Sequence, residues 1–229
     1  MGKIIAFTNK KGGVGKTTTA VNMAAYCAEA GKKVLLVDID SQGNATTALG
    51  FLKSGLKKSV YNVLIEDDTA EANILPTQVP GLDMLPANVD LSGAEVEIVY
   101  KRNRERLLKN ALDKIKADYD YIFIDCPPSL GVLTINAWVA SDSIIIPLQG
   151  EYFALEGVSQ LMNTISLVRQ HLNPNLQIEG VVITMYDGRA LISRQITAEI
   201  KKLHEETKKS GKEVTVRDVC KISDSIMKL

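Results

Sequence analysis

The stretch that decides the fold reads Lys10-Lys11-Gly12-Gly13-Val14-Gly15-Lys16-Thr17-Thr18. It follows the apolar run Ile4–Phe7 and precedes an alanine-rich segment, residues 20–25, that favours a helix. A strand, a glycine-rich turn and a helix start together form the setting of a phosphate-binding loop. The glycines have no Cβ, so the backbone N–H groups of the turn can approach phosphate oxygens closely.

Each side chain of this loop has an expected task. We expect Lys16 to place a charge at the β- and γ-phosphates and Thr17 to offer its hydroxyl to Mg²⁺. The common pattern G-x-x-x-x-G-K-[ST] would have a glycine at position 10, where this chain has Lys10, and Lys11 adds a second lysine inside the loop. The predicted phosphate-binding set is Gly12, Gly13, Val14, Gly15, Lys16, Thr17 and Thr18, with ATP and Mg²⁺ as ligands. The alternative is a glycine-rich turn with two solvated lysines.

Length and composition favour one α/β domain that spans residues 1–229. The chain has 229 residues, 45% of them apolar, and Lys plus Arg balance Asp plus Glu at 27 each. A chain of this size can bury one substantial core. The zero net charge argues neither for nor against binding of nucleic acid. Only a local basic patch could favour such binding.

Other compositional signals point to a reduced cytosolic protein. No run of 18 apolar residues exists, so we expect no transmembrane helix, and the chain enters a strand without a signal peptide. Cys27, Cys126 and Cys220 lack C-x-x-C spacing. We therefore expect no disulfide framework and no zinc or iron–sulfur site.

Strand and helix patterns alternate along the chain, which predicts a mostly parallel twisted β-sheet with helices on both faces. The expected strands cover residues 3–8, 33–38, 82–86, 121–125, 143–148 and 178–185, with a short one at 214–216. The expected helices run from the glycine-rich turn to about Gly31 and over residues 44–49, 60–65, 91–99, 104–116, 132–140, 155–171 and 193–209.

Two of the buried strands end in acids. In a parallel sheet the carboxyl ends of the strands line the ligand crevice, so Asp125 and Thr17 can be neighbours. We expect Asp125 to hold Mg²⁺ through water, because Mg²⁺ keeps much of its hydration shell. In Asp38-Ile39-Asp40, Asp40 is predicted to orient the attacking water and Asp38 to support the loop or the metal. The alternatives are an acid that only ends a strand and, for Asp40, a cap of the following turn.

Three motifs together resemble the ParA-type partition ATPases of the ParA/MinD superfamily. They are Lys11–Thr17, Asp38–Asn44 and Ile124–Ser129, and the stretch Ile146–Gly157 favours ParA over its MinD and nitrogenase-reductase relatives. The resemblance covers roughly residues 1–200 and weakens after that. It implies an ATPase, with ATP held between two subunits and Lys11 reaching the phosphates of the partner's ATP. Hydrolysis would then release an ATP-dependent homodimer.

The resemblance also implies further contacts. The nucleotide is expected to contact Pro127, Met185 and Val216. At the last of these positions relatives carry a proline before the arginine, whereas here Val216 precedes Arg217. The missing proline implies looser recognition of the base. Non-specific DNA is expected to contact Arg189, Arg217 and Lys221, since phosphate contact needs only charge. A ParB-type centromere-binding partner is expected to stimulate hydrolysis, and the protein to be cytoplasmic and nucleoid-associated. The chain begins directly before its first strand, so we expect no N-terminal helix-turn-helix and no sequence-specific operator binding.

Two other functions remain open. A MinD-like membrane switch would need an amphipathic helix at the C-terminus, but residues 214–229 have a weak apolar face interrupted by Asp218 and Asp224. A nucleotide-gated scaffold that positions cargo without hydrolysis is the third possibility. Lys11 and Asp40, both placed for turnover, argue against it.

Overall fold

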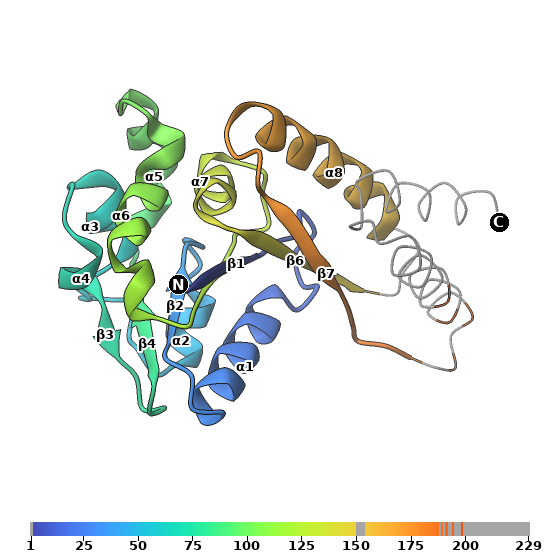
Figure 1. Cartoon of the computed structure of the whole chain (residues 1–229), viewed down its shortest axis with the longest axis horizontal. Helices are drawn as coiled ribbons and strands as arrows, with labels where there is room; N and C mark the ends of the chain where they lie inside the picture. Colours follow the sequence, from blue (N-terminus) through green and yellow to red (C-terminus); the bar gives the residue numbers. More distant parts are fainter. Residues whose placement is uncertain are drawn as a thin grey trace.

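A computed structural model describes residues 2–149 and 154–187, together with residues 189, 191, 194 and 198. Figure 1 shows strands that alternate with helices along the chain. The strands are β1 (Lys3–Phe7), β2 (Val34–Asp38), β3 (Leu75–Pro76), β4 (Leu82–Leu85), β5 (Tyr121–Asp125), β6 (Ser143–Gln149) and β7 (Gln177–Thr184). The α-helices are α1 (Lys16–Glu29), α2 (Asn44–Ala48), α3 (Val60–Ile65), α4 (Ala70–Asn73), α5 (Leu91–Glu97), α6 (Leu107–Ile115), α7 (Val132–Ala140) and α8 (Ala154–His171). Short 3₁₀ turns cover Ile98–Tyr100, Arg104–Arg106 and Lys116–Asp118.

The described strands form one sheet in the order β3-β4-β2-β5-β1-β6-β7. All neighbouring strands are parallel except β3 and β4, which pair antiparallel. The expectation of a mostly parallel α/β sheet is therefore confirmed. The antiparallel edge strand β3 was not predicted, because two residues are too few to show a periodic pattern.

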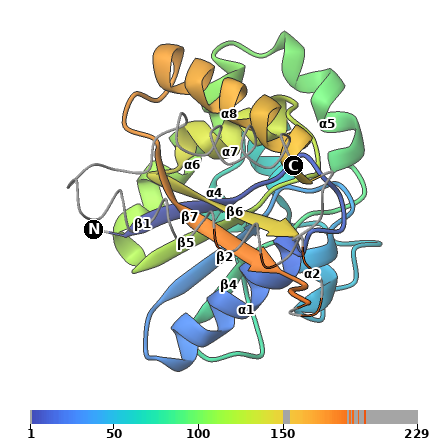
Figure 2. The same ribbon diagram turned by 90° about the vertical axis from the view of Figure 1, so that its right-hand side faces the viewer.

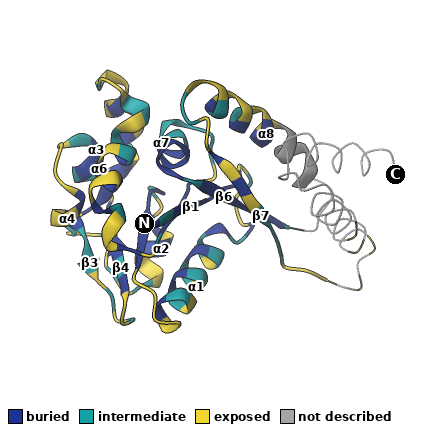
Figure 3. Ribbon diagram, in the orientation of Figure 1, coloured by how far each residue is buried: buried dark blue, intermediate teal, exposed yellow. Residues whose placement is uncertain are grey.

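Helices cover both faces of the sheet, and Figure 2 shows α1 and α2 on one side with α6, α7 and α8 on the other. Alternate residues of β1 divide between the two faces. Ile4 and Ala6 belong to the core under α3 and α5 to α8, whereas Ile5 and Phe7 belong to the core under α1 and α2. Figure 3 shows the central strands as a continuous buried layer. Burial on both faces explains why these strands read as unbroken apolar runs.

The helix α1 packs closely because its inward face is made of small residues. Ala20, Ala24 and Ala28 recur every fourth residue and are all buried. Gly31 follows the helix with φ 81°, and its N–H donates to the carbonyl of Ala28 at 2.9 Å. This left-handed residue ends the helix, as the sequence predicts. The helix α1 thus carries the glycine-rich turn at its N-terminus, next to the end of β1.

The remaining expected elements agree with the structure to within a few residues over the described ranges. The helix α4 was not predicted. The helix expected at residues 193–209 falls mostly, and the strand at 214–216 entirely, outside the described residues. Within the described part of the chain, no helix is both long and apolar enough to cross a bilayer.

Candidate nucleotide-binding site

The glycine-rich turn adopts the conformation that its residues allow. Gly13 and Gly15 have φ of 74° and 81°, a left-handed region that side chains with a Cβ rarely enter. Gly15 is the residue before α1, and its carbonyl accepts the N–H of Thr19 at 2.9 Å. The turn therefore delivers the chain from the end of β1 into the first turn of α1, where the free N–H groups and the helix dipole favour an anion.

A buried asparagine holds the entry of this turn. The Nδ2 of Asn9 donates to the carbonyl of Pro147 at 2.8 Å, and its Oδ1 accepts the N–H of Lys11 at 3.0 Å. Pro147 lies in β6, the neighbour of β1. Asn9 thus fastens the backbone of Lys11 to the sheet, a role for which the sequence shows no local pattern.

Lys16 is buried at the base of the loop. Its Nζ donates to the carbonyl of Lys11 at 3.2 Å, so the ammonium lies back across the turn. Burial lowers its pKa, and the negative charges of Asp125 and Asp40 act in the opposite direction. The structure therefore brings Lys16 and both acids into one electrostatic cluster at the carboxyl ends of the strands.

Asp125 ends β5 directly beside β1, where Phe7 is its partner in register. Both carboxylate oxygens are buried, and neither accepts a hydrogen bond from the described residues. Burial, and to a lesser extent the charge of Asp38, raises the pKa of Asp125 to about 8. The Thr17 hydroxyl lies close enough to lower this pKa, but it does not meet ordinary hydrogen-bond geometry. A buried carboxylate without a partner is costly unless a ligand completes it.

Asp38 ends β2 and faces Asp125 in register across the β2–β5 pair. Its Oδ2 accepts the N–H and the hydroxyl of Thr46 at 2.9 and 2.8 Å, and its Oδ1 accepts the N–H of Asp40 at 3.1 Å. Burial raises its pKa to about 6, which these hydrogen bonds counteract. The bonds fix the turn after β2 and the start of α2. Asp38 therefore supports the segment that carries Asp40, whereas the sequence suggested support of the phosphate loop or the metal.

Asp40 lies two residues after Asp38, at the start of the turn that follows β2. Its Oδ1 accepts the N–H of Gln42 at 2.9 Å, and its carbonyl accepts the N–H of Gly43 at 2.8 Å. The carboxylate therefore caps a turn, the alternative that the sequence left open, and it also lines the cavity described next. The two roles are compatible, because a carboxylate has further acceptor positions beyond the one that the turn uses.

A cavity of about 270 Å³ opens above the glycine-rich turn. It is lined by Gly12, Gly13, Gly15, Lys16, Thr17, Thr18, Asp40, Gln42, Asn44, Pro128 and Met185. No role was predicted for Gln42, Asn44 or Pro128. Their position could have indicated one, because each follows a strand whose carboxyl end lies at this edge of the sheet. Met185 follows β7 with φ 51°, an unusual angle for a residue with a long side chain.

Other predicted site residues do not line this cavity or lie outside the described residues. Pro127 is buried and does not line the cavity, where Pro128 stands instead. Val14 is fully buried. Arg189 is exposed, and its guanidinium forms two hydrogen bonds at 3.1 Å with the carboxylate of Asp187. Val216, Arg217 and Lys221 lie outside the described residues. The binding roles given to all of these remain predictions.

The residues present fit a hard cation that is bound partly by water and phosphate. The unpartnered oxygens of Asp125 and the hydroxyl of Thr17 are the oxygen donors that Mg²⁺ prefers. Within the described ranges, no group of three or more carboxylate, histidine or cysteine side chains forms a closed metal cage. Mg²⁺ seldom uses such a cage, because it keeps several waters and is held by one or two carboxylates together with substrate phosphates.

Comparison with known proteins agrees with this geometry. Residues 2–178 match a family described as an AAA domain. The sporulation initiation inhibitor protein Soj of Bacillus subtilis is 57% identical over 88% of this chain and 80% of its own length. The chromosome partitioning protein ParA of Myxococcus xanthus is 52% identical over 88% of this chain and 71% of its own.

A solved structure shares the fold at high similarity. It is a Mycobacterium smegmatis protein named cobyrinic acid a,c-diamide synthase, with bound ATP analogue and magnesium. It is 44% identical, covers 88% of this chain and 82% of its own, and superposes with a TM-score of 0.83. With Soj and ParA matching most of its length and the phosphate loop in place, this chain belongs to the Soj/ParA group of the ParA/MinD family of P-loop ATPases.

Proposed function

We propose that this chain hydrolyses ATP with Mg²⁺, dimerises when ATP is bound, binds DNA without sequence preference and drives partition of a chromosome or plasmid. A ParB-type protein is its proposed partner, which stimulates hydrolysis. The proposal rests most directly on one observation: a phosphate loop with a second lysine lies beside two strand-end acids, one of which has no hydrogen-bond partner among the described residues. Identity to Soj and ParA supports the partition role.

The residues at the cavity divide the work of phosphoryl transfer between them. The N–H groups of the glycine-rich turn and the ammonium of Lys16 hold the phosphates, and Thr17 and Asp125 hold the cation. Mg²⁺ supplies neutralisation of phosphate charge when bound. Asp40 is anchored by the Gln42 N–H and presents its carboxylate to the cavity, where it orients the attacking water. Phosphoryl transfer needs such positioning more than it needs a strong base.

Lys11 is the proposed link between nucleotide and dimerisation. Its backbone is fixed by Asn9, so the position at which its side chain leaves the loop is set by the sheet. The loop's own phosphates already have Lys16 as a cation. A second ammonium that reaches the partner subunit's ATP would add charge-assisted hydrogen bonds, each worth about 1.5–3 kcal/mol. Two such contacts per symmetric dimer bias assembly toward the ATP-bound state.

Three variants test this scheme, measured for MgATP binding, ATPase rate with DNA and partner, and mass by light scattering. Lys16→Ala should lose nucleotide. Lys11→Ala should keep nucleotide and stay monomeric, and Asp40→Ala should accumulate as an ATP-bound dimer. Lys10→Ala is the matched control, since Lys10 belongs to the same loop but bonds to Gln160 on α8. A monomeric Asp40→Ala variant with full activity would contradict the role given to Asp40.

DNA binding has its own test. Retention on DNA should require ATP, ignore base sequence and fall steeply with salt, because it depends on phosphate contacts. The Asp187 carboxylate already occupies the guanidinium of Arg189, so we expect Arg189 to add less than an unpaired arginine would. Binding that resists salt would contradict the proposal. ATP-dependent flotation with liposomes would favour the membrane switch, and absent ATPase activity with DNA and partner present would favour the scaffold.

A further inference from the structure

A threonine at the end of β7 makes an unusual contact with the phosphate loop. The Oγ1 of Thr184 donates to the carbonyl of Val14 at 2.8 Å. A Cβ placed on Gly15 would lie 3.4 Å from the Cγ2 of the same threonine, so the side chain packs directly on the loop. The two segments are 170 positions apart in the chain. The contact therefore exists only because β7 lies beyond β6 at the edge of the sheet.

The hydrogen bond has a geometric consequence for the anion site. A peptide unit is planar and trans, so its C=O and its N–H point in opposite directions. When Thr184 holds the carbonyl of Val14 against β7, the N–H of Gly15 in the same peptide unit is turned the other way. Gly15 lines the cavity whereas Val14 is fully buried. A glycine with φ of 81° has little steric resistance to reorientation, so an external contact is needed to keep this peptide in one orientation.

We infer that Thr184 is a positioning residue for phosphate binding: its hydroxyl orients the Val14–Gly15 peptide so that the Gly15 N–H faces the phosphates. A flipped peptide would place a carbonyl oxygen, with its partial negative charge, where the anion binds. Thr184 acts through this peptide. The inference rests on the proposed nucleotide binding and names a residue that the glycine-rich motif does not contain.

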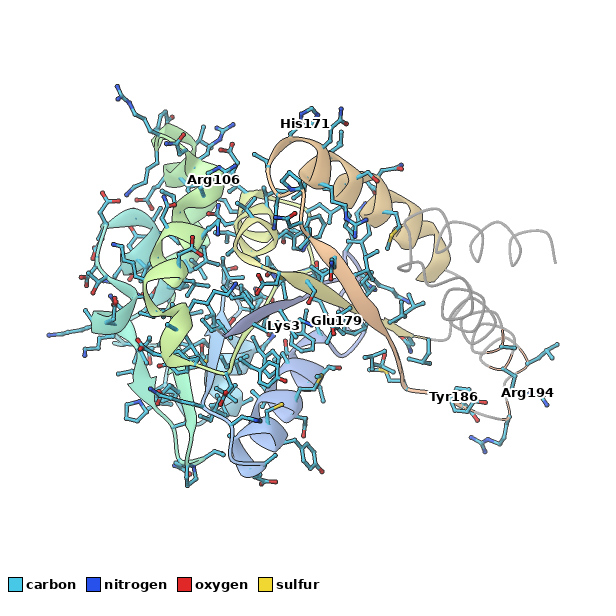
Figure 4. The ribbon with its side chains drawn as sticks, in the orientation of Figure 1. Lys3, Arg106, His171, Glu179, Tyr186 and Arg194 are labelled. Carbon is cyan, nitrogen blue, oxygen red and sulfur yellow. The ribbon has the colours of Figure 1, made fainter. Side chains whose placement is uncertain are left out.

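The same threonine begins the segment that leaves the sheet. Met185, the next residue, lines the cavity, and the Arg189–Asp187 pair follows closely. Figure 4 shows Tyr186 beyond the end of β7, away from the Lys3–Glu179 pair that joins β1 to the same strand with an Nζ–Oε2 distance of 2.6 Å. The hydrogen bond from Thr184 to Val14 therefore joins the phosphate loop to the start of this segment.

The first test measures MgADP binding by calorimetry, because ADP reports on the loop without requiring dimerisation. Thr184→Val keeps the shape but removes the donor, and we expect affinity to fall about tenfold. Thr184→Ser keeps the hydroxyl and should bind within about twofold of the unchanged protein. Thr164→Val is the matched control, since the Thr164 hydroxyl also donates to a carbonyl, that of Gln160 at 3.0 Å within α8. Equal losses in the Val and Ser variants, or no loss in either, would overturn the inference.

The second test needs no nucleotide and separates this inference from the proposed function. Amide hydrogen exchange of peptides covering residues 9–19 should be faster in Thr184→Val than in the unchanged protein, and restored in Thr184→Ser. Unchanged exchange in Thr184→Val would overturn the inference even if nucleotide binds. If the unchanged protein fails to bind MgADP, the proposed function fails, while the exchange result still decides whether Thr184 orders the loop.

Discussion

Two neighbouring strands, β2 and β5, both end in a buried aspartate, yet the two acids have opposite surroundings. Asp38 accepts hydrogen bonds from Thr46 and from the N–H of Asp40, whereas Asp125 accepts none from the described residues. They face each other in register and share burial as the main cause of a raised pKa. The difference separates an acid that holds the structure together from an acid prepared for a ligand. A strand that ends in aspartate does not by itself distinguish the two.

The largest expected effect is on turnover at the unpartnered acid. Asp125→Asn removes the charge that we propose holds Mg²⁺ but leaves the shape, so we expect kcat for ATP hydrolysis to fall by about 100-fold. The thermal midpoint of the nucleotide-free protein should stay nearly equal below about pH 8, where Asp125 is mostly neutral, and should rise above it, because a buried charge without a partner is destabilising. Activity assays beside a melting curve check both effects. A variant with a clearly lower melting temperature would mean that Asp125 is structural after all.

The next effect is on stability at the satisfied acid. In Asp38→Asn the side-chain NH₂ would face at least one of the backbone N–H groups, of Asp40 or Thr46, that donate to the carboxylate in the unchanged protein. We expect the free energy of unfolding to fall by about 2–4 kcal/mol, because buried charged hydrogen bonds are lost and donors are left unpaired. Denaturant unfolding measures it. Asp113→Asn is the control, since Asp113 pairs with Lys109 on the surface of α6 at 2.8 Å. A loss no larger than in that control would remove the distinction between the two acids.

The last effect is a pH dependence of stability that both acids share. Their pKa values, about 6 for Asp38 and about 8 for Asp125, lie above the ordinary value near 3.9. The folded protein therefore binds more protons than the unfolded chain between about pH 4 and pH 8. Their contribution to stability is fully present below about pH 4 and is lost as the pH rises through the folded values. The thermal midpoint of metal-free, nucleotide-free protein should fall across this window.

Asp125→Asn gives the comparison its sharpest form in the same experiment. It should remove the slope between about pH 6 and pH 8 and roughly halve the slope between about pH 4 and pH 6, where only Asp38 still contributes. Added Mg²⁺ with ADP should also reduce the upper part, because a cation favours the charged carboxylate. A slope that persists unchanged in Asp125→Asn would mean that another group titrates there.

Much of the fold could be predicted from local patterns. The strands β1, β2, β5 and β6 and the helix α1 appear where apolar runs and the glycine-rich turn place them, because each is specified by residues close together in the chain. The two-residue strand β3 and the helix α4 could not be predicted, since elements this short depend on their neighbours for stability.

The candidate site divides in the same way. Lys16, Thr17, Asp40 and Asp125 were predicted because strand ends and a glycine-rich turn mark them in the sequence. Pro128 lines the cavity although Pro127 was predicted, because adjacent residues of an irregular segment point in different directions and no period decides which. No local pattern marks Asn9, Thr46 or Thr184 in the sequence. Asn9 and Thr184 bond to Pro147 and Val14, which lie far away in the chain. Thr46 bonds to Asp38 across the turn after β2.

The amino-acid sequence alone determined the phosphate loop, the parallel α/β class and the family, because these depend on short motifs and on burial patterns that persist along the chain. The tertiary structure decided which aspartate is satisfied and which is left open, and what holds the loop in place. The physical reason is that hydrogen-bond satisfaction is a property of neighbours in space. Thr46 donates hydrogen bonds to Asp38, whereas no described group donates one to Asp125, although the two strands end alike.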